Sequence, residues 1–261
     1  MKKSYNANLN IKWDTHAHIY KCYYEDINDV IDSAKENNVG YIINSAVDKD
    51  SMVEVLESVN NFSNVYASLG IHPEYAESYK QEDIDFLKLN LNNKKVLAIG
   101  EIGMDYHYPG YNIEKQKELF EKQLKIAEEY KIPVVIHTRD ATKDTIDILK
   151  KYKVKGVIHS FSGSYETAME YINMGFFLGI NGVITFKNCN LKEVILKIGL
   201  DHLVLETDSP YLTPVPYRGK QNSPSHIADV AQFLADLFEV DVEYIANITT
   251  NNVERIFDKL Q

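Results

Sequence analysis

Two histidines lie two residues apart in the segment Asp14-Thr15-His16-Ala17-His18, which reads as the first strand of the chain. Side chains alternate between the two faces of a strand, so Asp14, His16 and His18 are predicted to point to the same side. Two imidazoles one strand repeat apart can bind one metal ion. Taken alone, the pair is equally compatible with chance or with a buried polar pair, so its interpretation depends on the rest of the sequence.

Four later segments that read as strands end in further residues of the metal-ligand type: Glu101, His137, His159 and Asp208. Histidines and carboxylates at successive strand ends are typical of a two-metal hydrolytic centre. Four neutral imidazoles and two carboxylates beside two divalent ions would leave about two net positive charges. That balance suits an anionic phosphodiester, whose negative charge grows during attack on phosphorus.

The elements that must position these residues alternate strand with helix. Several of the predicted strands are apolar on both faces, as in a parallel sheet covered by helices. The predicted strands are Lys12–His18, Val39–Ala46, Val65–His72, Val96–Gly103, Ile132–His137, Gly156–Phe161, Phe176–Ile180 and Leu203–Asp208. Amphipathic spacing predicts helices over Glu114–Tyr130, Ala141–Tyr152, Tyr165–Met174, Leu191–Ile198, Ser225–Leu237 and Val242–Phe257, with Ser225 and Asp241 as N-caps of the last two.

Eight strand–helix repeats within 261 residues predict an α/β protein with a (β/α)8 TIM barrel that spans residues 1–261 as a single domain. An open doubly wound sheet is the alternative. Two observations count against it. The glycine-rich dinucleotide fingerprint is missing, and ligand-type residues recur around nearly all strands rather than at one switch point.

The net charge limits how the protein could bind nucleic acid, and the cysteine content indicates its cellular compartment. The formal net charge of −10 argues against broad attraction to a nucleic-acid backbone, but allows a small site governed by bound metal ions. No apolar run could span a bilayer, and Met1–Asn10 lacks the apolar core of a signal peptide. Cys22 and Cys189 have no paired spacing and read as free thiols, so we expect a cytoplasmic protein with no membrane association.

With these motifs in place, the sequence resembles the TatD family of metal-dependent deoxyribonucleases, within the amidohydrolase-like barrels, over essentially the whole chain. The resemblance rests on Asp14-Thr15-His16-Ala17-His18, Gly70-Ile71-His72-Pro73, Gly100-Glu101-Ile102-Gly103-Met104-Asp105-Tyr106, His137-Thr138-Arg139-Asp140, His159-Ser160-Phe161-Ser162-Gly163, Glu206-Thr207-Asp208-Ser209-Pro210 and Pro216-Tyr217-Arg218-Gly219-Lys220. One departure is Gln221, where many members carry a basic residue before the asparagine that corresponds to Asn222. That departure puts one phosphate contact in doubt, but not the metal centre.

The resemblance implies two divalent metal ions bridged by Glu101. His16, His18, Glu101 and Asp208 would bind the first ion, and Glu101, His137 and His159 the second. In the mechanism that follows, a metal-activated water attacks phosphorus in line, and Asp208 accepts or orients its proton. The histidine-rich ligand set favours Zn²⁺, Mn²⁺, Fe²⁺ or Co²⁺, and Mg²⁺ is compatible with the family.

Other residues near the strand ends have a functional reading and a plain one. Arg139 shares the face of His137 and would bind phosphate, or else form a surface ion pair. His72 would bind phosphate or a third metal ion, or else cap a loop. Ser160 would donate a hydrogen bond near the metals. Arg218 would bind substrate from the loop after the eighth strand. Lys220 on the same loop would also contact substrate, or else is a solvated charge.

Two further groups of residues complete the predicted site. Asp14 and Glu206 are read as groups that orient ligand imidazoles or a buried water. Aromatic residues on loops near the site would stack on the bases of single-stranded DNA, or else are ordinary loop packing; these are Tyr106, Tyr108, Phe161, Tyr211 and Tyr217.

The leading expectation is therefore a metal-dependent phosphodiester hydrolase that acts on DNA, exonucleolytically and on single-stranded ends, with no obligatory protein partner. The alternative is a small-molecule amidohydrolase (a lactonase, amidase or deaminase) on the same dinuclear barrel. Many of those bridge their metals with a carboxylated lysine at the end of the fourth strand, where this chain has Glu101. A catalytically inactive metal-binding scaffold is a third reading, and it would require a missing ligand or proton acceptor.

Overall fold

Eight parallel strands pair in sequence order in the computed structural model, which describes residues 12–260. Beyond the β7–β8 pair, His18 N donates to Ser209 O at 2.7 Å and Asp208 N donates to His16 O at 2.9 Å, so the sheet closes into a barrel. The predicted (β/α)8 barrel is confirmed. The strands are β1 (Lys12–Ala17), β2 (Val39–Ser45), β3 (Val65–Leu69), β4 (Val96–Asp105), β5 (Val134–Arg139), β6 (Gly156–Ile158), β7 (Phe176–Ile180) and β8 (Leu203–Leu205).

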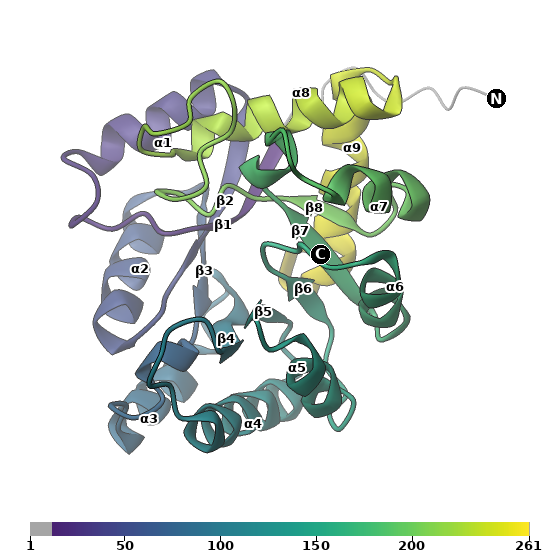
Figure 1. The fold of residues 1–261 in the computed structure, drawn as a ribbon. Coiled ribbons are helices and arrows are strands. Elements are labelled where there is room, and N and C mark those ends of the chain that lie inside the picture. The colour runs from purple at the N-terminus through teal and green to yellow at the C-terminus, as the bar shows by residue number, and fades with distance from the viewer. Residues whose placement is uncertain (1–11, 261) are drawn as a thin grey trace.

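Helices α1 to α8 surround the strands as a ring, and α9 lies behind the strands in the view of Figure 1. The helices are α1 (Ile27–Glu36), α2 (Lys49–Asn61), α3 (Gln81–Asn90), α4 (Ile113–Tyr130), α5 (Thr142–Leu149), α6 (Tyr165–Asn173), α7 (Leu191–Ile198), α8 (Ile227–Phe238) and α9 (Val242–Ile256). Residues 12–260 also contain four short 3₁₀ turns: η1 (Pro73–Tyr75), η2 (Gly182–Thr185), η3 (Pro224–His226) and η4 (Asp258–Leu260). Within residues 12–260, no helix is both long and apolar enough to cross a membrane.

The six helices expected from amphipathic spacing are present, and α1 to α3 are additional. The Ser225 cap was misplaced, because a 3₁₀ turn precedes α8 and moves its first residue to Ile227. Asp241 does occupy the N-cap position of α9, but its side chain makes no capping hydrogen bond.

The interior of the barrel has an apolar end and a polar end. At the N-terminal end of the strands, inward side chains pack together and against the C-terminal part of α9; they include Trp13, Ile43, Leu97, Val135, Val157, Phe177 and Val204. Two residues further along β5, the inward position of Val135 is taken by His137, as strand alternation requires. Polar residues therefore meet at the carboxyl ends of the strands, the end where TIM barrels place their chemistry.

Candidate metal centre

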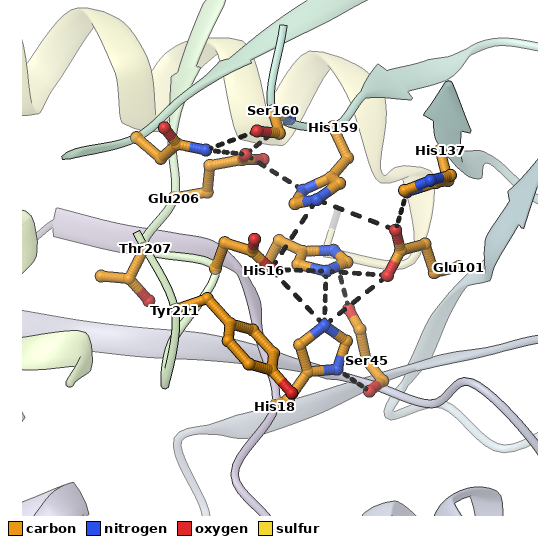
Figure 2. A network of polar contacts seen from close by, with 12 residues as sticks. His16, His18, Ser45, Glu101, His137, His159, Ser160, Glu206, Thr207 and Tyr211 are labelled. Atoms are coloured by element: carbon orange, nitrogen blue, oxygen red, sulfur yellow. Dashed lines mark hydrogen bonds and ion pairs between the residues drawn. The ribbon is translucent and has the colours of Figure 1, made fainter. Parts of the chain in front are cut away.

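Three of the expected ligands meet at the end of β1 and the middle of β4. The Nε2 atoms of His16 and His18 lie 3.1 Å apart. Glu101 Oε2 lies 3.2 Å from His16 Nε2 and 3.6 Å from His18 Nε2. All three residues are buried, and Figure 2 shows their polar atoms turned toward one another. The two imidazole nitrogens and the carboxylate oxygen thus share one small space.

The second oxygen of Glu101 faces a different pair of imidazoles. Glu101 Oε1 lies 2.7 Å from His137 Nδ1 and 3.8 Å from His159 Nε2. The donor atoms of Glu101, His137 and His159 all lie within 4.8 Å of one another, as do those of His16, His18 and Glu101. Glu101 therefore stands between two groups of histidines, with one oxygen toward each.

Asp208 approaches the same space from the loop after β8. Its Oδ1 lies 3.5 Å from His18 Nε2, and 3.7 Å from both His16 Nε2 and His159 Nε2. The side chain is 13% exposed, compared with 5% for Glu101, so Asp208 is the more open of the two carboxylates. Its backbone has a φ of 55°, in the left-handed region that non-glycine residues rarely adopt.

Two of the imidazoles have a polar partner at Nδ1, on the side of the ring that faces away from the shared space. His18 Nδ1 lies 3.0 Å from the carbonyl oxygen of Ser45, which can only accept, so Nδ1 holds the proton and Nε2 keeps its lone pair. His159 Nδ1 lies 3.0 Å from Glu206 Oε1, which contacts the ring on the corresponding side. The donor set fits divalent metal ions, because imidazole nitrogens and carboxylate oxygens, which are the ligand atoms that such ions take, converge on one small space.

Glu206 contacts the imidazole of His159, as the sequence predicts. Its side chain is fully buried, and Oε1 also accepts from Ser160 N at 2.7 Å and from Asn181 Nδ2 at 3.3 Å. A Cβ at Gly179 would lie 2.1 Å from Glu206 Oε2, so glycine on β7 makes the room for this carboxylate. Glu206 thereby ties β7, β8 and the residues after β6 to one ligand.

Asp14 does not share this role, and the prediction that it lies on the face of His16 and His18 is wrong. Its carboxylate accepts from Thr207 N at 2.9 Å and from Thr207 Oγ1 at 2.5 Å, and it contacts no imidazole. The strand pairing shifts register between Asp14 and Ala17, which interrupts the alternation on which the prediction relied. Asp14 instead joins β1 to the segment after β8.

Charge around the centre shifts several pKa values. Burial alone would raise the pKa of Glu101, but the imidazoles of His159, His16 and His137 outweigh it and hold that pKa well below the usual range. Burial would lower the pKa of His137, but its bonds to Asp105 and Glu101 raise it to about 9. Carboxylates and imidazoles thus stabilise each other's charged forms, as expected for a site built to hold cations.

Asp105 is a further residue of the site, beyond those predicted from the sequence. Its Oδ2 lies 2.9 Å from His137 Nε2, and its donor atoms and those of His72 and His137 lie within 4.8 Å of one another. The signal was available, because Asp105 follows Glu101 by four residues and so returns to the same strand face. Gln116 on α4 holds this strand end, since its side chain bonds both Asp105 N and Asp105 O.

A cavity of about 590 Å³ opens above the candidate metal ligands, and three of the four predicted substrate contacts line it: His72, Arg139 and Ser160. Arg218 does not line it, because its guanidinium lies over the ring of Phe186 at 3.9 Å, so its role in binding stays a prediction. The capping interpretation of His72 is confirmed, and its binding of phosphate or a third metal ion stays a prediction. Its Nδ1 accepts from Glu74 N at 3.2 Å and caps η1, while Nε2 lies 3.9 Å from Glu101 Oε1.

The aromatic lining of the cavity differs from the one expected. Tyr106 stacks on Tyr111 and donates to Asp144, and Tyr217 stacks on His226, so neither lines the cavity. The lining includes the expected Tyr108, Phe161 and Tyr211, and also Tyr20, Tyr23 and Tyr75. Those three belong to loops whose course over the barrel follows from no periodicity in the sequence.

Comparisons with known proteins agree with this geometry. The family model described as TatD related DNase matches residues 13–258. The metal-dependent hydrolase YabD of Bacillus subtilis is 41% identical over 250 residues, which cover 94% of this chain and 98% of that protein. The metal-dependent hydrolase YcfH of Escherichia coli K12 is 37% identical and covers 94% of each chain. The crystal structure of YjjV, a TatD homologue from Escherichia coli K12, superposes with a TM-score of 0.89 at 31% identity, over 95% of this chain and 98% of that one.

Proposed function

Because the chain belongs to the TatD-related DNase family and is a metal-dependent hydrolase, we propose that it cleaves the phosphodiester bonds of DNA. One observation carries the proposal: the two oxygens of Glu101 each face a separate pair of imidazoles at the base of a cavity. A bridged pair of divalent ions is the arrangement that stabilises both the attacking and the leaving oxygen of an in-line displacement at phosphorus.

We assign the ligands as the donor groups suggest. His16, His18, Glu101 and Asp208 would hold one ion, and Glu101, His137 and His159 a second. His72 and Asp105 could hold a third ion, which would compete with the second for His137, because a neutral imidazole has a single lone pair. Imidazole-rich ligation favours Zn²⁺, Mn²⁺, Fe²⁺ or Co²⁺, with Mg²⁺ also accepted.

The bound ions would lower the pKa of the attacking water and would stabilise the negative charge on the phosphate oxygens. The chain's own residues do the rest. Asp208 faces the cavity and would accept or orient the proton of the attacking water. Arg139 would bind a substrate phosphate through its guanidinium, and Ser160 would donate a hydrogen bond beside it. Glu206 holds the ring of His159 in place.

We further propose that the substrate is a single-stranded DNA end, cleaved exonucleolytically in the cytoplasm. A cavity of about 590 Å³ has the size of a small-molecule site and would take a few groups of one strand. The net charge of −10 disfavours a long track along duplex DNA. Free thiols at Cys22 and Cys189 suit a reducing compartment.

The test is cleavage of end-labelled single-stranded DNA with each divalent metal, by wild type, Asp208→Asn and chelated protein. Asp140→Asn is a matched control, because Asp140 has a φ of 54°, close to the 55° of Asp208, but pairs with His107 outside the ligand set. We expect progressive shortening from one end, lost in Asp208→Asn and on chelation and kept in Asp140→Asn. Asp208→Asn should lower turnover about 10²–10⁴-fold and change DNA affinity little.

Absence of cleavage with every metal, by protein that holds two ions, would overturn the nuclease assignment in favour of a small-molecule hydrolase. Equal losses of turnover and affinity in Asp208→Asn would contradict the role of Asp208 in moving a proton.

A further inference from the structure

We propose that the mouth of the cavity has two chemically different flanks that orient the substrate strand: Tyr23 and Tyr211 stack on a base, and Arg139 binds a neighbouring phosphate. The inference rests on the proposed nuclease function and adds a direction to it. A strand held by a base on one side and a phosphate on the other can lie across the metal-ligand residues in one sense only.

The aromatic flank begins at a metal-ligand residue. The rings of His18 and Tyr211 lie 6.4 Å apart at 66°, and Figure 2 shows Tyr211 beside His18. Tyr211 and Tyr23 meet edge to face with centroids 5.9 Å apart, and their hydroxyl oxygens lie 2.7 Å apart in a hydrogen bond. Tyr20 stacks behind Tyr23 at 5.7 Å and 21°. The rings thus form a continuous wall from the metal-ligand residues to the cavity mouth.

The outer rings of this wall are exposed but held in place. Tyr23 is 36% exposed and Tyr211 49%, whereas Tyr20 behind them is 6% exposed and donates its hydroxyl to Ser45 O. A phenol ring fixed by its hydroxyl loses little freedom when a flat ligand covers it. Stacking of a base on such a ring changes affinity roughly ten- to a hundred-fold and tolerates any base, because every base has a π-face.

The opposite flank, at the end of β5, carries charge. Arg139 is the sole lysine or arginine among the described residues that line the cavity. Its neighbour Asp140 pairs with His107 at 3.0 Å, and no carboxylate within residues 12–260 lies within ion-pair distance of Arg139. The guanidinium lies 5.4 Å from the ring of Tyr108, which is 60% exposed. A guanidinium with no acidic partner at a cavity mouth is suited to a phosphate, which it can bind through two hydrogen bonds.

The two flanks lie on different sides of the candidate metal centre. Tyr211 adjoins His18 of the first ligand group, whereas Arg139 follows His137 of the second by two residues on the same strand. A scissile phosphate placed over Glu101 and Asp208 would therefore have a base toward Tyr211 and another phosphate toward Arg139. The expected consequence is digestion from one end only.

The base contact is tested by binding, in the Asp208→Asn background that holds substrate without turnover. Short single strands with one abasic residue, moved stepwise along the chain, are titrated against Asp208→Asn alone and combined with Tyr211→Ala, Tyr211→Phe or Tyr217→Ala. At one abasic position we expect a loss of affinity of about ten- to a hundred-fold that vanishes in Tyr211→Ala and persists in Tyr211→Phe. Tyr217 is the matched control, since it lies on the same loop, 37% exposed, but outside the cavity.

The phosphate contact is tested in the same way with a single uncharged methylphosphonate linkage and the variants Arg139→Gln and Arg139→Lys. We expect one linkage whose neutralisation weakens wild-type binding but not binding by Arg139→Gln. The two-flank proposal would be overturned if the affinity losses were additive, that is, if removing the base and the Tyr211 ring, or the phosphate charge and the Arg139 guanidinium, acted independently. Cleavage by wild type would in that case still support the nuclease function. An enzyme that neither binds nor cleaves single strands would overturn both.

Discussion

The two ends of the barrel interior use the same strands for opposite purposes. On β5, Val135 packs in the apolar end and His137, two residues later, lies in the metal-ligand group. Val157 and His159 repeat the relation where β6 ends. Buried valine contributes stability through lost water contact, whereas a buried imidazole or carboxylate costs stability unless it finds partners. Within the barrel interior, apolar burial is therefore concentrated at one end and the cost of burying polar groups at the other.

The polar end shows how that cost is limited. His18 and His159 each have a partner behind the ring, and Glu101 lies among imidazoles that stabilise its charge. The remaining nitrogen and oxygen atoms of these side chains face one shared space, where a cation would bind them. If this account is right, changes at the polar end should alter metal binding and turnover, and changes at the apolar end should alter stability alone.

Metal removal should give the largest effect and should act at the polar end alone. Stripping the ions abolishes hydrolysis, and restoring them at about 1,000 times their dissociation constant should stabilise the fold by about 4 kcal/mol per site. The measurement is denaturant unfolding with and without metal, beside an activity assay. A fold whose stability ignores added metal would contradict a centre built in the native state.

Leu97→Ala should produce the converse result. Leu97 is 1% exposed within the apolar end, so its truncation should cost about 2–5 kcal/mol of unfolding free energy. Turnover and metal affinity should stay near those of wild type at temperatures where the variant is folded. A large fall in turnover by folded Leu97→Ala protein would show that the two ends are not separable.

Glu206→Gln should have the smallest effect of the three and should sharpen the comparison within the polar end. Glutamine keeps the size of the side chain but weakens the hold on His159 Nδ1, so affinity for the second ion should fall about 10–100-fold. Calorimetric metal titration measures this change, and saturating metal should restore most of the turnover. An unchanged titration would mean that Glu206 serves packing rather than the ligand.

The barrel and its ligand positions were predictable because both follow from strand alternation and from strand ends. The same reasoning failed at Asp14, where a register shift breaks the alternation. It also passed over α3, whose sequence is rich in charge and buries only Ile84 and Leu87. A short helix that covers little apolar surface leaves a weak periodic signal.

The cavity mouth was less predictable than its base. Tyr23 lies between β1 and α1 and meets Tyr211, which is 188 residues away in the chain. Arg218 and Tyr217, in contrast, looked like site residues by position but turn to Phe186 and His226. Loop paths depend on tertiary contacts rather than on local sequence pattern. The residues at the base of the cavity can therefore be predicted from the sequence, whereas those at its mouth require the structure.

The most direct test of the account is the number of metal ions bound by reconstituted protein, measured by elemental analysis for wild type, His18→Ala and His159→Ala. We predict at least two ions for wild type and one fewer in each variant, because His18 and His159 face opposite oxygens of Glu101. A single ion in wild type, or an unchanged number in either variant, would contradict a bridged centre.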